Sequence, residues 1–194
     1  MTSSLARLSR SICRVSTGRV ALAALVGFLF FTALVLPVQA ARARLMAGGA
    51  GSPDLSFFYA AADLYRMAEA YGASGRAAYV HARFTFDVVW PLVYMVFLAS
   101  SISWVFRTAV GPGSRWLSAN LLPVAGALFD LLENISASAV MVRYPRTTPL
   151  VDVLAPIFTM TKWVLVSGSF MTLLGAIAAG LWRWRHGRPV PETV

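Results

Sequence analysis

The stretch that decides the fold is residues 117–142, LSANLLPVAGALFDLLENISASAVMV, an apolar segment long enough to cross a bilayer as a helix. It carries Asp130, Glu133 and Asn134 near its middle, where a membrane is driest. An acid at that depth costs about 2.5–3.5 kcal/mol on insertion scales, so a helix with two acids needs partners for both. The sequence therefore predicts a membrane-spanning helix that turns a polar face toward other helices.

The composition is that of a multi-pass membrane protein. Of the 194 residues, 58% are hydrophobic and 13% are charged, whereas charged residues make up about a quarter of an ordinary soluble domain. The net charge of +9 comes mostly from arginines that flank apolar segments, which is typical of membrane topology and argues against a nucleic-acid-binding protein. The single cysteine, Cys13, excludes an internal disulfide and a thiolate zinc site, and His81 and His186 lie too near segment ends to predict a haem inside the bundle.

Four apolar segments predict an all-α integral membrane protein, a bundle of four transmembrane helices. A single membrane domain would cover residues 20–182, with basic tails at 1–19 and 183–194. The predicted spans are residues 20–38, 84–106, 117–142 and 151–182. For the first span a cleaved signal peptide is the alternative interpretation, because Val38-Gln39-Ala40 resembles a cleavage site, although the apolar run exceeds the usual length of a signal peptide.

The connection between the first two spans contains signals for a helix of its own. Ser52, Pro53 and Asp54 are typical of a helix start and Gly72 of a helix stop, which predicts a helix over residues 53–71. One stripe of this helix would be apolar, comprising Phe57, Ala61, Leu64, Ala68 and Tyr71. An amphipathic helix of this kind either lies on the outer membrane surface or covers the bundle.

The distribution of arginine predicts that both termini are cytoplasmic and that the protein is in the cell membrane. The two tails and the loop after the second span hold nine arginines against Glu192. The opposite side holds seven arginines, offset by Asp54, Asp63 and Glu69. Because arginine is enriched on the cytoplasmic side of membrane proteins, this asymmetry favours the orientation with both ends inside.

The third and fourth spans place their polar residues at the same depth. Glu133 lies 10 residues before Arg143 and Lys162 lies 12 residues after Leu150, on either side of a short loop. We therefore expect Lys162 to pair with Glu133 or Asp130 across the two helices. Helical spacing assembles a binding site from Asp87, Asp130, Glu133, Asn134 and Lys162, and a secondary set of Arg83, Tyr94, Ser138, Thr159 and Ser169.

Asp87 on the second span has two interpretations. Arg83 precedes it by one turn and Tyr94 follows it by two turns, so Asp87 either guards an entrance to the site or lies in the headgroup layer. Pro91 lacks an N–H, which leaves the backbone carbonyl of Asp87 without its helical donor. The carbonyl of Asp152 is freed in the same way by Pro156.

Three functions are consistent with these residues. The polar site binds or translocates a cation, a proton or a lipid headgroup; or the ion pair only sets helix register in a structural or accessory subunit; or carboxylate acid–base chemistry modifies a lipid. No catalytic motif supports the enzyme, so the sequence favours a role without catalysis, assigns no catalytic residue and leaves the cofactor unknown. Expected partners are the bilayer, a lipid or small cation as ligand, and further copies or another membrane subunit.

Overall fold

The computed structural model describes residues 3–47, 49–53, 56–111 and 115–187. Helices make up 86% of the structure, and the described residues contain no strand. The prediction of an all-α protein is therefore confirmed. Asp54, which the sequence places in the first turn of a loop helix, lies outside the described residues.

Four helical stretches in the described part of the chain are long and apolar enough to cross a membrane. They are Gly18–Met46, Gly72–Ala109, Trp116–Arg143 and Val151–Arg185. Each contains one of the predicted spans and extends beyond it, by the greatest length in the first two stretches. Their number, length and composition fit the predicted membrane protein.

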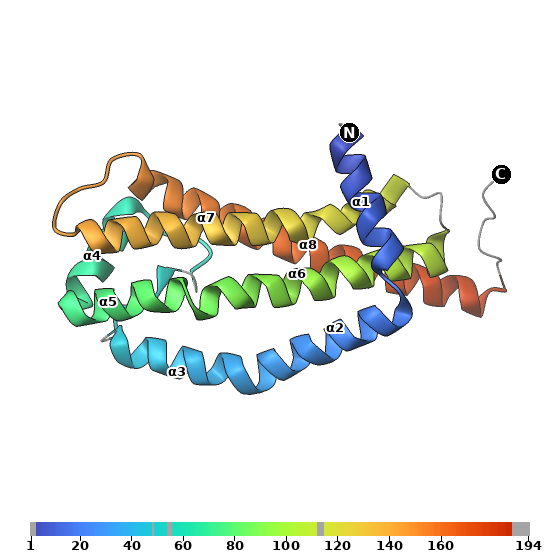
Figure 1. Cartoon of the computed structure of the whole chain (residues 1–194), viewed down its shortest axis with the longest axis horizontal. Helices are drawn as coiled ribbons and strands as arrows, with labels where there is room; N and C mark the ends of the chain where they lie inside the picture. Colours follow the sequence, from blue (N-terminus) through green and yellow to red (C-terminus); the bar gives the residue numbers. More distant parts are fainter. Residues whose placement is uncertain (1–2, 48, 54–55, 112–114, 188–194) are drawn as a thin grey trace. The chain divides into compact units, whose positions relative to one another are not determined.

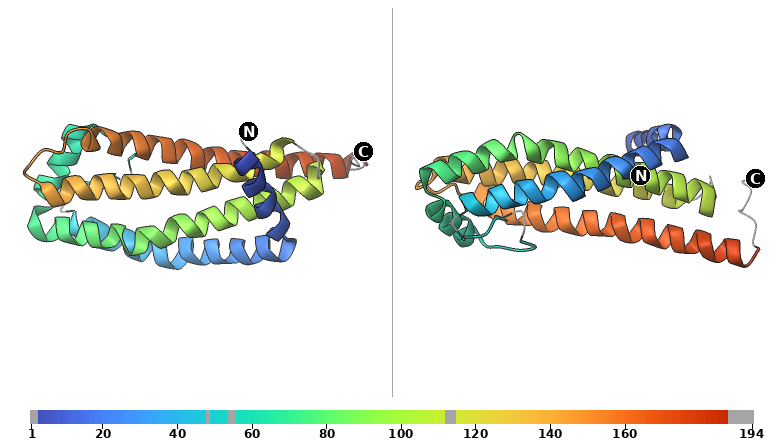
Figure 2. Two further views of the ribbon diagram at one scale, coloured as in Figure 1. Left: turned by 45° about the horizontal axis from the view of Figure 1, so that its top comes forward. Right: turned by 90° about the horizontal axis from the view of Figure 1, so that it is seen from below.

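Residue contacts divide the chain into two compact units, and each is described by itself. Unit 1 consists of Met1–Leu29, Val93–Ala125 and Leu165–Val194, and unit 2 consists of Phe30–Leu92 and Gly126–Val164. The ribbon in Figures 1 and 2 can be followed through the helices named below.

Unit 1 contains the N-terminal helix and the ends of the long helices nearest to it in the fold. Its elements are α1 (Ser3–Val15), most of α2 (Gly18–Phe30), parts of α6 (Phe86–Val105), α7 (Leu122–Arg143) and α8 (Val151–Arg185), the π-helical η3 (Phe106–Val110) and the 3₁₀-helical η4 (Arg115–Leu121). Phe28 stacks on Phe97 with ring centroids 4.6 Å apart, and Phe170 lies 6.1 and 6.3 Å from these two rings. The sequence predicts only a basic tail over residues 1–19, but Ser3–Val15 within it form the helix α1.

Unit 2 contains the π-helical η1 (Phe31–Val35), α3 (Leu36–Met46), α4 (Ala61–Ala70), α5 (Gly72–Arg83) and the remaining parts of α6, α7 and α8. Its buried core joins Leu64 and Ala68 of α4 to Val140 and Met141 of α7 and Ala155 of α8. The hydroxyl of Tyr65 donates to Asp152 at 3.0 Å and accepts from the amide of Thr148 at 2.7 Å. Helix α4 is thus tied to the loop between α7 and α8 through Thr148 and to the first turn of α8 through Asp152.

The helix predicted over residues 53–71 is shorter than expected. Residues 56–60 are not helical, and α4 begins at Ala61 because the Asp63 carboxylate accepts the amide of Ala60 at 2.8 Å and caps the helix there. Phe57, expected on the buried stripe, is 59% exposed because it precedes the helix, whereas Leu64 is fully buried. Gly72 follows α4 with φ of 61°, which fits the predicted stop.

Prolines accompany departures from regular α-helix in two of the candidate spans. The π-helical η1 immediately precedes Pro37, which lies in the first turn of α3 and has no N–H to continue the regular ladder. The third span starts as the 3₁₀ helix η4 and becomes α-helical only at Leu122, next to Pro123. Proline is well placed in the first turn of an α-helix, where the missing N–H has no intrahelical partner to lose.

Candidate functional site

The centre of the candidate site is a buried lysine between two buried acids, all within unit 2. Lys162 Nζ on α8 lies 2.5 Å from Glu133 Oε2 and 3.7 Å from Asp130 Oδ1 on α7. The three side chains are 7%, 1% and 10% exposed, respectively. The predicted pairing of Lys162 across the two helices is therefore present, and it includes both acids instead of one.

Helix geometry explains why one ammonium reaches both carboxylates. Asp130 and Glu133 are three residues apart, so they project from one face of α7 about one turn apart. The loop after α7 is short, and counting residues outward from it places Lys162 at the level of these acids. The ammonium also lies 5.5 Å from the ring centroid of Trp163, a distance at which an aromatic ring favours a cation.

Asn134 connects this centre to α6. Its Nδ2 donates to the backbone carbonyl oxygen of Asp87 at 3.0 Å. That carbonyl has no helical donor because residue 91 is proline, so the amide of Asn134 takes the place of the missing N–H. A buried acceptor left without a donor costs roughly 1–3 kcal/mol, which gives Asn134 a specific structural role.

Asp87 forms a second ion pair beside the first. Arg83 Nη2 lies 3.1 Å from Asp87 Oδ2, with the two side chains 6% and 14% exposed. Arg83 ends α5 and Asp87 lies in the first turn of α6, and the guanidinium is centred 4.6 Å from the ring of Tyr79. The side chain of Asp87 therefore pairs with Arg83 inside unit 2.

Two further predicted residues lie on the same faces of α7 and α8. Thr159 is fully buried, and its Oγ1 lies 3.0 Å from the carbonyl oxygen of Ala155 and 3.1 Å from the hydroxyl of Tyr59. Ser138 is 3% exposed, one turn beyond Asn134. Within the described residues, neither Ser138 Oγ nor Asn134 Oδ1 has a hydrogen-bond partner. This face of α7 thus presents buried oxygens that water or a ligand would satisfy.

The other two predicted residues belong to unit 1. Tyr94 is 4% exposed there, and Ser169 is fully buried and donates to the carbonyl oxygen of Leu165 at 2.7 Å. The cluster described here is built from unit 2 alone: Arg83, Asp87, Asp130, Glu133, Asn134, Ser138, Thr159 and Lys162.

Sequence reasoning missed two tyrosines that support this cluster. Tyr59 reaches Thr159 from the segment before α4, and Tyr65 joins α4 to Asp152. Tyr59 lies more than one hundred residues from Lys162 in the sequence, and nothing in the local pattern separates it from the neighbouring exposed Phe57 and Phe58.

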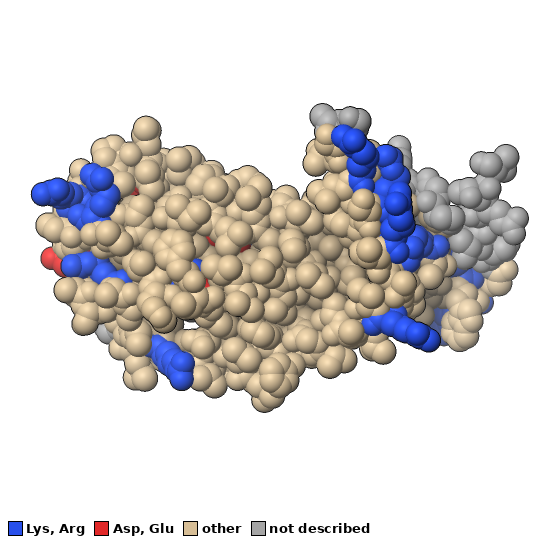
Figure 3. Space-filling model, in the orientation of Figure 1, with Lys and Arg blue, Asp and Glu red and all other residues tan. Residues whose placement is uncertain are grey.

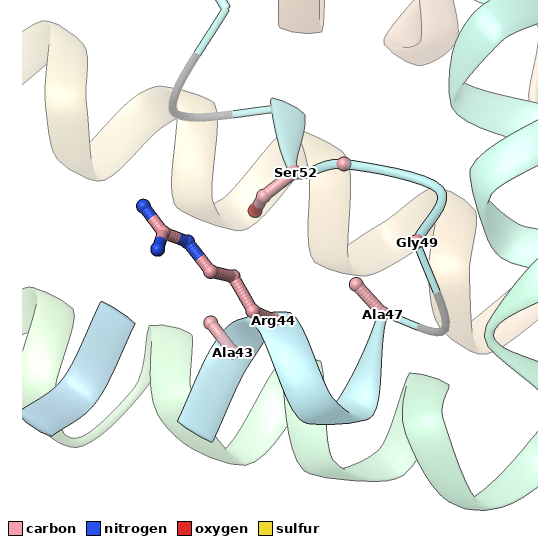
Figure 4. A pocket seen from close by; sticks show the side chains of 6 residues that line it. Ala43, Arg44, Ala47, Gly49 and Ser52 are labelled. Atoms are coloured by element: carbon pink, nitrogen blue, oxygen red, sulfur yellow. The ribbon is translucent and has the colours of Figure 1, made fainter. Parts of the chain in front are cut away.

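A pocket in unit 2 is lined by none of these residues. It follows the end of α3 and is lined by Ala43, Arg44, Ala47, Gly49, Gly51 and Ser52 (Figure 4). Among the residues that the structure describes, no group of three or more histidine, cysteine, aspartate or glutamate side chains is placed to hold a metal ion. Lys162 instead supplies a positive charge between the acids.

Comparisons with models of known protein families, with curated proteins and with solved structures found no match to this chain.

Proposed function

We propose that the chain is a multi-pass membrane protein whose buried cluster binds a proton and carries it through the protein. The observation that carries this proposal is the charge of the cluster. Arg83 and Lys162 face three acids, Asp87, Asp130 and Glu133, all of them buried or nearly so. With every group ionised the cluster has a net charge of −1, and one bound proton makes it neutral.

A proton fits the geometry better than a metal cation does. Lys162 Nζ lies 2.5 Å from Glu133 Oε2 and 3.7 Å from Asp130 Oδ1, so a metal ion bound by both acids would compete with the positive charge of the ammonium. A proton needs no such displacement and no additional ligands, whereas hard cations such as Ca²⁺ take six to eight oxygens. Buried ionisable residues within membrane spans are typical of proton relays, where a carboxyl changes charge without moving its helix.

Two polar side chains on α7 extend the path of the proton beyond the carboxylates. Asn134 Oδ1 and Ser138 Oγ, which have no hydrogen-bond partner among the described residues, belong to residues one turn apart on α7, and Asn134 directly follows Glu133. A water molecule bonded to such oxygens is the usual way in which buried polar groups are satisfied. Hydrogen-bonded waters and carboxyls together form a path for proton transfer.

The test is proton entry into liposomes that contain the purified full-length protein and a trapped pH-sensitive dye. Under an imposed pH gradient we expect faster acidification than in empty liposomes. Glu133→Gln and Asp130→Asn should each reduce the rate toward that of empty liposomes, because the amides cannot exchange a proton. Asp130→Asn keeps the close pair of Lys162 with Glu133, so a reduced rate of proton entry in this variant is not explained by loss of that pair.

Asp152→Asn is the matched control. Asp152 also lies on α8 in unit 2, but it accepts from Tyr65 and is not part of the cluster. This variant should retain the rate of the unmodified protein. A rate equal to that of empty liposomes for the well-folded protein would contradict the proposal and leave the ion pair as a structural element that sets helix register. An equal loss in Asp152→Asn and Glu133→Gln would also contradict it.

A further inference from the structure

Helix α1 carries a stripe of arginines that the buried cluster does not involve. Arg7, Arg10 and Arg14 follow one another at spacings of three and four residues, so they project from the same side of the helix. All three are exposed, whereas Ser9, on another side of the helix, is 5% exposed. Figure 3 shows basic side chains running along the helix nearest the N-terminus.

Polar contacts within unit 1 hold α1 in a fixed orientation. Asn120 of η4 is fully buried, and its Nδ2 lies 3.1 Å from the carbonyl oxygen of Ser9 and 2.9 Å from Ser103 Oγ. At the end of α1, the guanidinium of Arg107 donates to the carbonyl oxygen of Ser16. The arginine stripe is therefore presented on a helix that is anchored to the rest of its unit.

No acid in the described part of unit 1 neutralises the stripe. The charged side chains that the structure describes in this unit are all arginines, namely Arg7, Arg10, Arg14, Arg19, Arg107, Arg183 and Arg185. Neither Arg10 nor Arg14 has an ion-pair partner among the described residues. The surface that they form is complementary to negative charge.

The surroundings of α1 are those of a helix at a membrane boundary. The first candidate span begins at Gly18, three residues after α1 ends. Leu5 and Leu8, outside the arginine stripe of α1, are 46% and 43% exposed. Trp116 and Trp184 of the same unit are 58% and 81% exposed, and tryptophan is enriched at the level of lipid headgroups.

We propose that α1 is an interfacial helix whose arginine stripe binds the headgroups of anionic phospholipids. The basic side would face the phosphates while the partly exposed leucines contact the upper acyl chains, as in other amphipathic helices at membrane surfaces. This binding is independent of the buried cluster, so either proposal can fail without the other.

The test measures which lipids surround α1 in liposomes that contain the full-length protein. A fluorophore is attached at Ser11→Cys, beside the stripe, in a Cys13→Ser background. Its quenching by spin-labelled phosphatidylglycerol is compared with its quenching by spin-labelled phosphatidylcholine. We expect phosphatidylglycerol to quench more strongly. The preference should fall by about fivefold for each arginine changed to glutamine, because one basic residue near an anionic surface contributes about that factor.

Controls separate charge from helix structure. Arg7→Lys, Arg10→Lys and Arg14→Lys together keep the charge and should keep most of the preference, whereas high salt should reduce it. Equal quenching by the two lipids in the unmodified protein would overturn the proposal, as would a preference that survives the three glutamines.

Discussion

Replacing Lys162 by methionine removes the positive charge between Asp130 and Glu133 while keeping a side chain of similar length. At an effective dielectric constant of about 20, unit charges attract by about 7 kcal/mol at the 2.5 Å separation from Glu133 and by about 4.5 kcal/mol at the 3.7 Å separation from Asp130. Most of this attraction offsets the cost of taking the three charges out of water. The two acids, left without their lysine, then bear that cost alone.

The size of the loss is limited by protonation. Adding a proton to a carboxylic acid of ordinary acidity costs about 4 kcal/mol at pH 7, and one added proton replaces the lost charge of Lys162. We therefore expect Lys162→Met to lower the free energy of unfolding by about 4 kcal/mol, within the range of about 3–5 kcal/mol for broken buried pairs.

A second substitution tests whether the loss comes from the stranded charge. Glu133→Leu combined with Lys162→Met restores the original net charge, so the double variant should recover most of the stability that Lys162→Met loses. Asp130→Leu should rescue less, because Asp130 is the more distant and the more exposed of the two acids. The assay is unfolding in mixed bicelles by added SDS, followed by tryptophan fluorescence.

Two outcomes would refute the reasoning about Lys162. A silent Lys162→Met would mean that the ammonium reaches the membrane surface and contributes no buried pair. Strictly additive effects of Lys162→Met and Glu133→Leu would mean that the two side chains are not coupled.

Three further predictions concern other parts of the chain. Reporter fusions at Gly49, after α6 and at the C-terminus should read outside, inside and inside, because arginine favours the cytoplasm; a cytoplasmic Gly49 would contradict this topology. Asn134→Leu should cost about 1–3 kcal/mol in unfolding assays, and adding Pro91→Ala should recover part of it by restoring a donor to the Asp87 carbonyl; no recovery would contradict that role of Asn134. The backbone amide of Ala60 and then Arg66 lower the pKa of Asp63 below 3.8. The capping of α4 by Asp63 should therefore be present above that pH and be lost as the pH falls through the folded pKa; hydrogen-exchange protection of the first-turn amides that does not decrease in acid would contradict this.

The parts of the fold that depend on local pattern could be predicted from the sequence. The four helical stretches that are long and apolar enough to cross a membrane follow from length and hydrophobicity, because a bilayer requires about 20 apolar residues for each crossing. The pairing of Lys162 with the acids of α7 could also be predicted. A short loop and the constant rise of a helix place the three side chains at one depth.

Other features were decided by contacts between residues distant in sequence. Tyr59 reaches Thr159, and Asn134 reaches the carbonyl of Asp87, through packing that no local periodicity encodes. Phe57 and Leu64 fall on one predicted stripe. Because the cap formed by Asp63 starts the helix after Phe57, Leu64 is buried and Phe57 is not.

Helix α1 shows the same division. The spacing of its arginines can be read from the sequence. Its orientation depends on the hydrogen bond from Asn120, more than one hundred residues away. Hydrophobic length and helical repeat are properties of a chain segment, and the sequence alone therefore determined the four long apolar helices and the level of the buried charges along them. Hydrogen bonds between segments form only after the helices pack, and for that reason only the tertiary structure decided which polar groups satisfy one another.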